Sequence, residues 1–433
     1  MTKVQDYIII EKHNKKRGFY MEEKYEEIKK TLVKYNQEQL LVNYKNMNQK
    51  DKEKLLSEIE NIDFGFMNSL YKYAKKELTF KDEKIESIDC TEKDRLPKEE
   101  KEKYDKIGTE KIKAGKLAVV TMAGGQGTRL GHSGPKGTFK LNVGKEMSLF
   151  EILCKTLKEA KEKYGVYVHW YIMTSNQNNK ETVEFFEKNN YFDYPKEKVT
   201  FFIQGELPMV GLDGKVLVDE KGFVKLASDG HGGVFESMDK SGVLEQMKKE
   251  GTEWVFVGGV DNVLVKMVDN TLIGLAESKN CLAAGKSLIK ANEKEKVGVF
   301  CMRNGKPSVI EYSEISDELA ELKDENGELV YSESHILCNM FNMKRLEMIS
   351  KNKLPYHVAK KKANYMNEKG EIITAKEPNA YKFESFIFDA FTSLDSMVIM
   401  RVKREEEFAP VKNAEGVDSP ETATKLYKDF YKI

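Results

Sequence analysis

The feature that most constrains this chain is an apolar run that ends in a cluster of glycines. Residues Leu117–Ala123 have the composition of a buried strand, and three of the next four residues are glycine. Glycines directly after a strand let the backbone approach a ligand closely and turn several N–H groups toward it. Arg129 and Lys136 add fixed positive charge shortly afterwards. The segment therefore predicts a binding site for a nucleoside triphosphate.

Two common glycine-rich motifs do not fit this segment. A Walker A loop requires a Lys-Ser or Lys-Thr pair after the glycines, and none follows them here. A dinucleotide-binding fingerprint would need its third glycine at the position of Leu130. The plain alternative is an ordinary glycine turn with incidental cations nearby. The strand in front of the turn favours the phosphate-binding interpretation.

Composition excludes several broad classes of protein. The 71 basic and 71 acidic side chains balance, which argues against a nucleic-acid-binding surface built on bulk charge. The five cysteines are scattered without C-x-x-C spacing, so reduced thiols in the cytoplasm are the simplest interpretation. No stretch approaches the roughly 20 apolar residues of a membrane span. We expect a cytoplasmic protein that binds neither nucleic acid nor membrane.

The pattern of apolar residues changes along the 433 residues. Over residues 1–104 they recur at helical spacing among Lys and Glu, which predicts a helical N-terminal region. Over residues 105–342 strand and helix patterns alternate, which predicts an α/β domain with a doubly wound, mostly parallel, Rossmann-like sheet. Residues 343–433 are mixed and predict a small C-terminal domain. Ligands of such sheets bind beyond the carboxyl ends of the strands.

Polar residues follow several of these predicted strands. Gln204 ends one of them, and its amide can both donate to and accept from the edge of a pyrimidine base, although it could equally be a solvated loop residue. Asp261 ends another and is a natural ligand for Mg²⁺, with helix capping as the alternative. The run DGHGG at 229–233 predicts a nest of backbone amides at the start of a helix.

Six motifs occur in order over about residues 105–415. They are AGGQGTRLG with a following Pro-Lys pair, FFIQGELP, GGVDNVLVKMVD, VIEYSEI, KFESFIFDAF and VKREEEFAPVKN. Together they resemble the motifs of the sugar-nucleotide pyrophosphorylases, above all those of the UDP-N-acetylglucosamine and UDP-glucose enzymes. The resemblance implies a nucleotidyltransferase fold and a reaction of UTP with a sugar 1-phosphate that yields UDP-sugar and pyrophosphate. It also implies Mg²⁺, or Mn²⁺ in its place, as the cofactor.

Carried over residue by residue, the resemblance implies which residues bind the nucleotide, the phosphates, the sugar and the metal. The nucleotide would be held by Ala123, Gly124, Gly125, Gln204, Gly230 and Asp261. The phosphates around the reacting centre would be held by Arg129, Lys136, Lys382 and Lys412. The sugar would be contacted by His231, Glu311, Tyr312 and His335, and Asp261 would also meet the metal.

Two positions depart from the pattern of the N-acetylglucosamine enzymes. His231 stands where they usually have Asn, and the UDP-glucose enzymes typically have G-H-G there. His335, in HILCN, stands at a second Asn position associated with the sugar. We expect a monomer that forms UDP-N-acetylglucosamine. The alternatives are the same chemistry on glucose or galactose 1-phosphate, and a non-catalytic sensor of nucleotide sugars.

Overall fold

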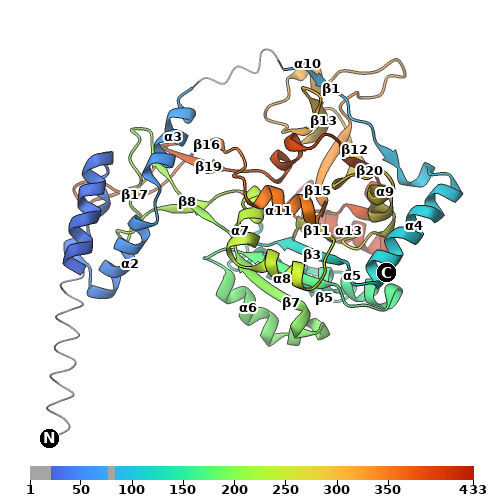
Figure 1. Ribbon diagram of the computed structural model, residues 1–433, viewed down its shortest axis with the longest axis horizontal. Helices are drawn as coiled ribbons and strands as arrows, with labels where there is room; N and C mark the ends of the chain where they lie inside the picture. The colour runs from blue at the N-terminus through green and yellow to red at the C-terminus, as the bar shows by residue number, and fades with distance from the viewer. Residues whose placement is uncertain (1–20, 77–82) are drawn as a thin grey trace, which may run out of the picture. The chain divides into compact units, whose positions relative to one another are not determined.

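The computed structural model describes residues 21–76 and 83–433, and these fold into two compact units (Figure 1). Of these described residues, the first unit contains 21–76, 206–230 and 356–384. The second contains 83–205, 231–355 and 385–433. Because each unit is assembled from three separate stretches, the units do not coincide with the three consecutive segments expected from the sequence.

The second unit is built on a mostly parallel sheet, which confirms the expected α/β fold. Its strands follow the order β2-β20-β12-β15-β11-β3-β6-β7. In addition, β13 pairs with β15, and β1 and β14 each pair with β13. The bounds are β1 (Ile85–Glu86), β2 (Thr91–Glu92), β3 (Leu117–Met122), β6 (His169–Thr174), β7 (Val199–Ile203), β11 (Trp254–Gly259), β12 (Ala283–Ile289), β13 (Val299–Arg303), β14 (Lys306–Ile310), β15 (Glu333–Asn342) and β20 (Val398–Arg401). Every residue of β3 and β6 is buried, as expected for parallel strands covered on both faces.

Strand β15 is antiparallel to the two strands beside it in this order. β15 lies between β11 and β12 and is antiparallel to both, with Gly258 paired to Cys338 and Ser287 paired to His335. The first residues of β15 therefore lie beside the last residues of β11 and β12. The chain leading into β15 consequently reaches the same edge of the sheet as the loops that leave the parallel strands.

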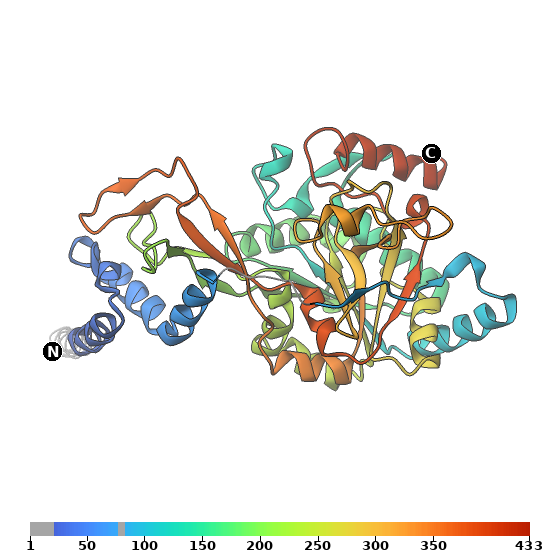
Figure 2. The same cartoon turned by 90° about the horizontal axis from the view of Figure 1, so that it is seen from above.

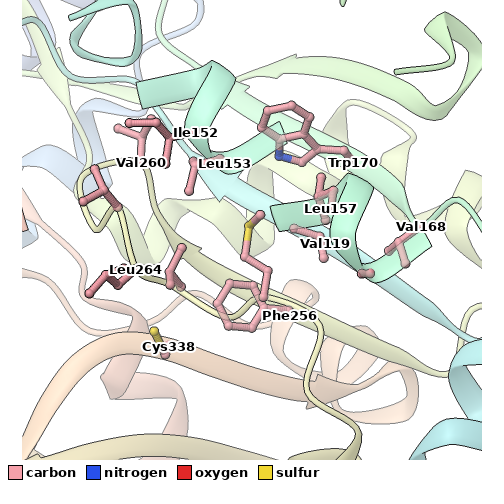
Figure 3. Close-up of a cluster of buried hydrophobic side chains, with 14 of the residues drawn as sticks. Val119, Ile152, Leu153, Leu157, Val168, Trp170, Phe256, Val260, Leu264 and Cys338 are labelled. Carbon is pink, nitrogen blue, oxygen red and sulfur yellow. The ribbon is translucent and has the colours of Figure 1, made fainter. Parts of the chain in front are cut away.

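Helices cover both faces of the sheet. On one face α5 (Leu149–Tyr164) packs Ile152, Leu153 and Leu157 toward Val119 of β3 and Trp170 of β6 (Figure 3). The same core includes α4 (Lys98–Lys113), α9 (Asn270–Ser278) and α13 (Pro420–Tyr431). The core of the other face includes α7 (Val234–Lys240), α8 (Val243–Lys249) and α11 (Met343–Ser350). The sheet is therefore enclosed, and its polar edge is the place where a ligand can enter.

Helices α4 and α9 lie side by side and touch through glycine (Figures 1 and 2). A Cβ on Gly108 of α4 would lie 1.9 Å from the carbonyl oxygen of Asn270. A Cβ on Gly274 of α9 would lie equally close, 1.9 Å, to the carbonyl oxygen of Tyr104. No larger residue fits at either position without separating the two helices. This contact fixes α4 against the sheet.

The first unit combines helices with small antiparallel sheets. Its elements include α2 (Gln49–Glu60), α3 (Phe64–Ala74), β8 (Glu206–Pro208), β9 (Val210–Gly211), β10 (Leu226–Ser228), β16 (His357–Lys361) and β19 (Ala380–Glu384). The helical prediction for residues 1–104 falls in part on residues 1–20 and 77–82, which lie outside the described residues. Within the described part, α2, α3 and the start of α4 are helical, but β1 and β2 are strands that join the large sheet. Across the described residues, no helix combines the length and apolarity needed to cross a membrane.

Candidate active site

The glycine loop after β3 is held in place by a buried asparagine. The side-chain amide of Asn178 donates to the carbonyl oxygens of Ala123, at 2.9 Å, and Gly125, at 3.2 Å. The Oδ1 atom of Asn178 accepts from the backbone N–H of Ser175 at 2.8 Å, and the residue is fully buried. The turn after β6 therefore fixes the loop after β3. Asn178 is not among the residues predicted from the sequence, because nothing in its local sequence marks a residue that bonds to another loop.

Gly124 and Gln204 lie against each other, as the sequence prediction requires. A Cβ on Gly124 would lie 2.6 Å from Oε1 of Gln204 and 3.6 Å from Cβ of Ser175. The backbone of Gln204 is fixed by its N–H, which donates to the carbonyl oxygen of Thr174 at 2.8 Å. Beside this pair, the buried hydroxyl of Ser175 has no hydrogen-bond partner among the described residues. The three strand ends of β3, β6 and β7 thus bring polar groups together around Gly124.

The same loop brings a lysine to the end of the neighbouring strand. The backbone N–H of Lys136 donates to the carbonyl oxygen of Gly125 at 3.1 Å, which turns the chain back on the glycines. The ammonium of Lys136 lies 3.8 Å from the carboxylate of Asp261, which follows β11. Because β3 and β11 are parallel neighbours, their carboxyl ends meet at one edge of the sheet. A fixed cation and a fixed anion therefore share the site.

Most of the predicted site residues of the second unit line one cavity of about 390 Å³. These are Arg129, His231, Asp261, Glu311, Tyr312, His335 and Lys412. The segment that carries Lys412 is tied to the sheet edge, because the N–H of Val411 donates to the carbonyl oxygen of Asp261 at 2.9 Å. The ammonium of Lys412 lies 3.7 Å from Asp418, whose carboxyl pKa is raised mainly by burial. The cavity, which Lys296 also lines, thus combines three cations with hydroxyl, imidazole and carboxylate groups.

The two histidines of the cavity are held by defined hydrogen bonds. Nδ1 of His231 accepts from the backbone N–H of Ile387 at 3.0 Å, so this nitrogen carries no proton. Nε2 of His335 lies 3.0 Å from Oδ1 of Asn339, and burial lowers the pKa of His335 to about 4. His335 is therefore neutral near pH 7, with the proton on Nε2 and an accepting lone pair on Nδ1.

A second buried asparagine was also missed from the sequence. Asn262 directly follows Asp261, and its side-chain amide donates to the carbonyl oxygen of Glu407 at 2.7 Å. Its Oδ1 accepts from the N–H of Ala409 at 2.8 Å. Asn262 therefore joins the end of β11 to the segment before Lys412. The only sequence signal was its place beside Asp261 in the VDN motif.

Two predicted residues belong to the first unit and are described there by themselves. Lys382 lies on β19, where its ammonium is 2.7 Å from the carboxylate of Glu384. Gly230 follows β10 with a φ of +90°, a conformation that favours glycine, and its N–H donates to Oγ of Ser228 at 3.3 Å. Their contacts with a nucleotide remain predictions.

Comparisons with known proteins identify the family of this chain. The model of the family described as UTP--glucose-1-phosphate uridylyltransferase matches residues 67–418. The UDP-N-acetylglucosamine pyrophosphorylase of Saccharomyces cerevisiae is 36% identical over 424 residues, covering 92% of this chain and 88% of the relative. The UDP-N-acetylglucosamine diphosphorylase 2 of Arabidopsis thaliana is 36% identical over 417 residues, covering 91% and 82%.

A solved structure shows the same arrangement. The uridine diphosphate N-acetylglucosamine pyrophosphorylase of Trypanosoma brucei, crystallised with an inhibitor, superposes with a TM-score of 0.77 at 29% identity. The match covers 91% of this chain and 82% of that structure. The family model, the curated relatives and the solved structure agree: the chain belongs to the UDP-sugar pyrophosphorylase family of UTP-dependent sugar 1-phosphate uridylyltransferases.

Proposed function

We propose that this protein forms UDP-N-acetylglucosamine and pyrophosphate from UTP and N-acetylglucosamine 1-phosphate. The observation that carries the proposal is the single cavity in which Arg129 and Lys412 lie with Asp261 and the polar residues assigned to the sugar. Relatives that match most of this chain are named for the same product, which supports the choice of sugar.

The chemistry follows from the charges of the two substrates. A phosphate oxygen of the sugar 1-phosphate attacks the α-phosphorus of UTP, and pyrophosphate leaves on the opposite side. This oxygen is an anion at neutral pH, so the attack needs no general base. Two unit charges 4 Å apart repel by about 4 kcal/mol at an effective dielectric constant near 20. Arg129, Lys136 and Lys412 offset this repulsion, and the loops hold the reactants in line.

The base and the sugar are recognised at opposite sides of the reacting phosphates. The amide of Gln204 and the backbone at Gly124 pair with the uracil edge, because an amide can match both its donors and its acceptors. On the sugar side, the accepting Nδ1 of His335 suits the N–H of an acetamido group.

A divalent cation is part of this proposal. Among the described residues, no group of three or more His, Cys, Asp or Glu side chains gathers as a metal centre. Mg²⁺ is usually held by one or two carboxylates together with substrate phosphates, so a lone Asp261 beside the triphosphate suits Mg²⁺ or Mn²⁺. The ion would neutralise phosphate charge during the transfer. The five free thiols support a cytoplasmic location, and we propose that the enzyme acts as a monomer.

Pyrophosphate release with UTP and a panel of sugar 1-phosphates tests the proposal. We expect the highest kcat/KM with N-acetylglucosamine 1-phosphate. The second candidate, UDP-glucose or UDP-galactose formation, is favoured by His231 in its G-H-G sequence and predicts a preference for those hexose phosphates. Binding of UTP without pyrophosphate release from any sugar would instead indicate a nucleotide-sugar sensor.

A further inference from the structure

Four charged side chains are packed together inside the second unit, and the ammonium of a fifth residue, Lys266, lies 3.8 Å from one of them, Glu407. The reaction described above uses none of them. Lys286 of β12 is fully buried, with its ammonium 2.8 Å from the carboxylate of Asp269 and 2.5 Å from that of Glu407. The ammonium of Lys93 lies 2.8 Å from Asp269 and 3.6 Å from Glu407. Two ammonium groups thus face two carboxylates, which is the pairing that buried charges require.

The neighbouring charges decide the protonation states of Lys286 and Asp269. Burial alone would lower the pKa of Lys286, but the carboxylates of Asp269 and Glu407 outweigh burial and raise that pKa. Burial would raise the pKa of Asp269, but Lys286 and Lys93 outweigh it and lower that pKa. Lys286 and Asp269 are therefore both charged near pH 7.

Glu407 connects this cluster to the active site. It ends α12 (Arg404–Glu407), and its own carbonyl oxygen accepts from the side chain of Asn262, next to Asp261. Four residues farther on, the N–H of Val411 donates to the carbonyl oxygen of Asp261. Lys412 is the next residue. Residues 407–412, which lead to Lys412, are thus held by backbone hydrogen bonds at the sheet edge and by the Glu407 side chain in the interior.

Stability alone does not explain this ionic anchor. Replacing a buried ion pair by apolar residues of similar volume is often neutral or stabilising, because removing the charges from water costs about as much as their attraction returns. An ion pair differs from an apolar contact in that it is directional, so it holds Glu407 in one place along the segment. A shift of about 1 Å in a group that positions substrate can cost roughly 100-fold in rate.

We propose that Lys286 and Glu407 are positioning residues that set the place of Lys412 and thereby the binding of the sugar phosphate. The inference rests on the function proposed above, in which Lys412 contacts that phosphate. Neither residue touches a substrate in this scheme. Both act through the segment between Glu407 and Lys412.

The test is the double variant Lys286→Met/Glu407→Leu. Removing both groups leaves the Lys93–Asp269 pair, 2.8 Å apart, so the interior stays neutral and the fold is expected to persist. We expect the KM for the sugar 1-phosphate to rise about 10- to 100-fold, while the Kd for UTP, measured by calorimetry, changes less than about threefold. Glu407→Gln, which keeps the shape of the side chain, should also raise the KM for the sugar 1-phosphate without changing the Kd for UTP, but by a smaller factor. Glu405→Gln is the control, because Glu405 lies on the same helix and is exposed.

Hydrogen exchange provides a readout that does not depend on activity. The amides of Ala409 and Val411 should exchange faster in the double variant than in the wild type, whereas the amides of β3 should not change. Wild-type KM values together with unchanged exchange at these two amides would overturn the positioning role. If the wild-type enzyme released no pyrophosphate with any sugar 1-phosphate, the proposed function would fail, and the exchange data would still decide whether the ion pair positions the segment.

Discussion

Adding one methyl group to the glycine loop is predicted to impair nucleotide binding without unfolding the protein. In Gly124→Ala the new Cβ would lie 2.6 Å from Oε1 of Gln204, closer than the 3.0 Å that a Cβ tolerates. The other two nearest atoms, in Ser175 and Thr174, are both 3.6 Å away, at ordinary contact distance. The clash therefore falls on the end of a flexible side chain, and the amide of Gln204 must move rather than the backbone.

In the proposed complex with UTP, the displaced amide would lose its place beside the uracil. Losing the hydrogen bonds of a buried polar group costs about 1–3 kcal/mol, and each 1.4 kcal/mol corresponds to about tenfold in affinity. We therefore expect the KM for UTP to rise about 5- to 150-fold in Gly124→Ala. Pyrophosphate release at varied UTP concentrations measures this change. The thermal unfolding midpoint should stay near that of the wild type.

A double-mutant cycle isolates the cause. Gln204→Ala removes the atom that clashes, so adding Gly124→Ala to that variant should cost little more. Equal costs of Gly124→Ala with and without the Gln204 side chain would show that the methyl group disturbs something other than the amide. A UTP KM within twofold of the wild type for Gly124→Ala alone would refute the reasoning altogether.

Three further predictions use other parts of the structure. Lys136→Ala should lower kcat about 100-fold or more at an unchanged melting temperature, because it removes a cation that offsets phosphate repulsion; near-normal pyrophosphate release would contradict its role. Gly108→Ala should destabilise the protein by about 1–3 kcal/mol in denaturant titrations, because its Cβ meets backbone on α9, whereas the exposed Lys106→Ala should be nearly neutral. Burial raises the pKa values of the thiols of Cys154 and Cys338 to about 12, so both should resist alkylation at pH 8 and react once the protein is unfolded; rapid labelling of either thiol in the native protein would contradict its burial.

The sheet and much of the candidate site could be predicted from the sequence, because buried parallel strands have a recognisable apolar pattern. The apolar runs at β3 and β11 are buried on both faces, and the residues that follow parallel strands meet at one edge. Arg129 and Asp261 are therefore brought into one cavity by strand order alone. The resemblance of the motifs supplied the residues that no local pattern marks, such as Lys412.

The features that escaped prediction depend on contacts between distant segments. Asn178 holds the glycine loop from the next strand, and no local pattern shows that an asparagine will bond to backbone more than fifty residues earlier. Lys286 looks like a surface lysine in a lysine-rich chain, yet its carboxylate partners are supplied from residues 269 and 407. The short strands β1 and β2 form because the large sheet offers them an edge.

The reversed direction of β15 has a consequence for how such an enzyme can diverge. His335, near the start of β15, reaches the site cavity because β15 runs opposite to β11 and β12. Glu311 and Tyr312 reach the same cavity by following β14, whose last residue, Ile310, pairs with Val299, which in turn pairs with Ser334 of β15. The glycine loop and Asp261 arrive by leaving parallel strands. If Glu311, Tyr312 and His335 contact the sugar as proposed, substitutions or length changes between residues 311 and 335 would alter which sugar is accepted without changing the glycine loop or Asp261.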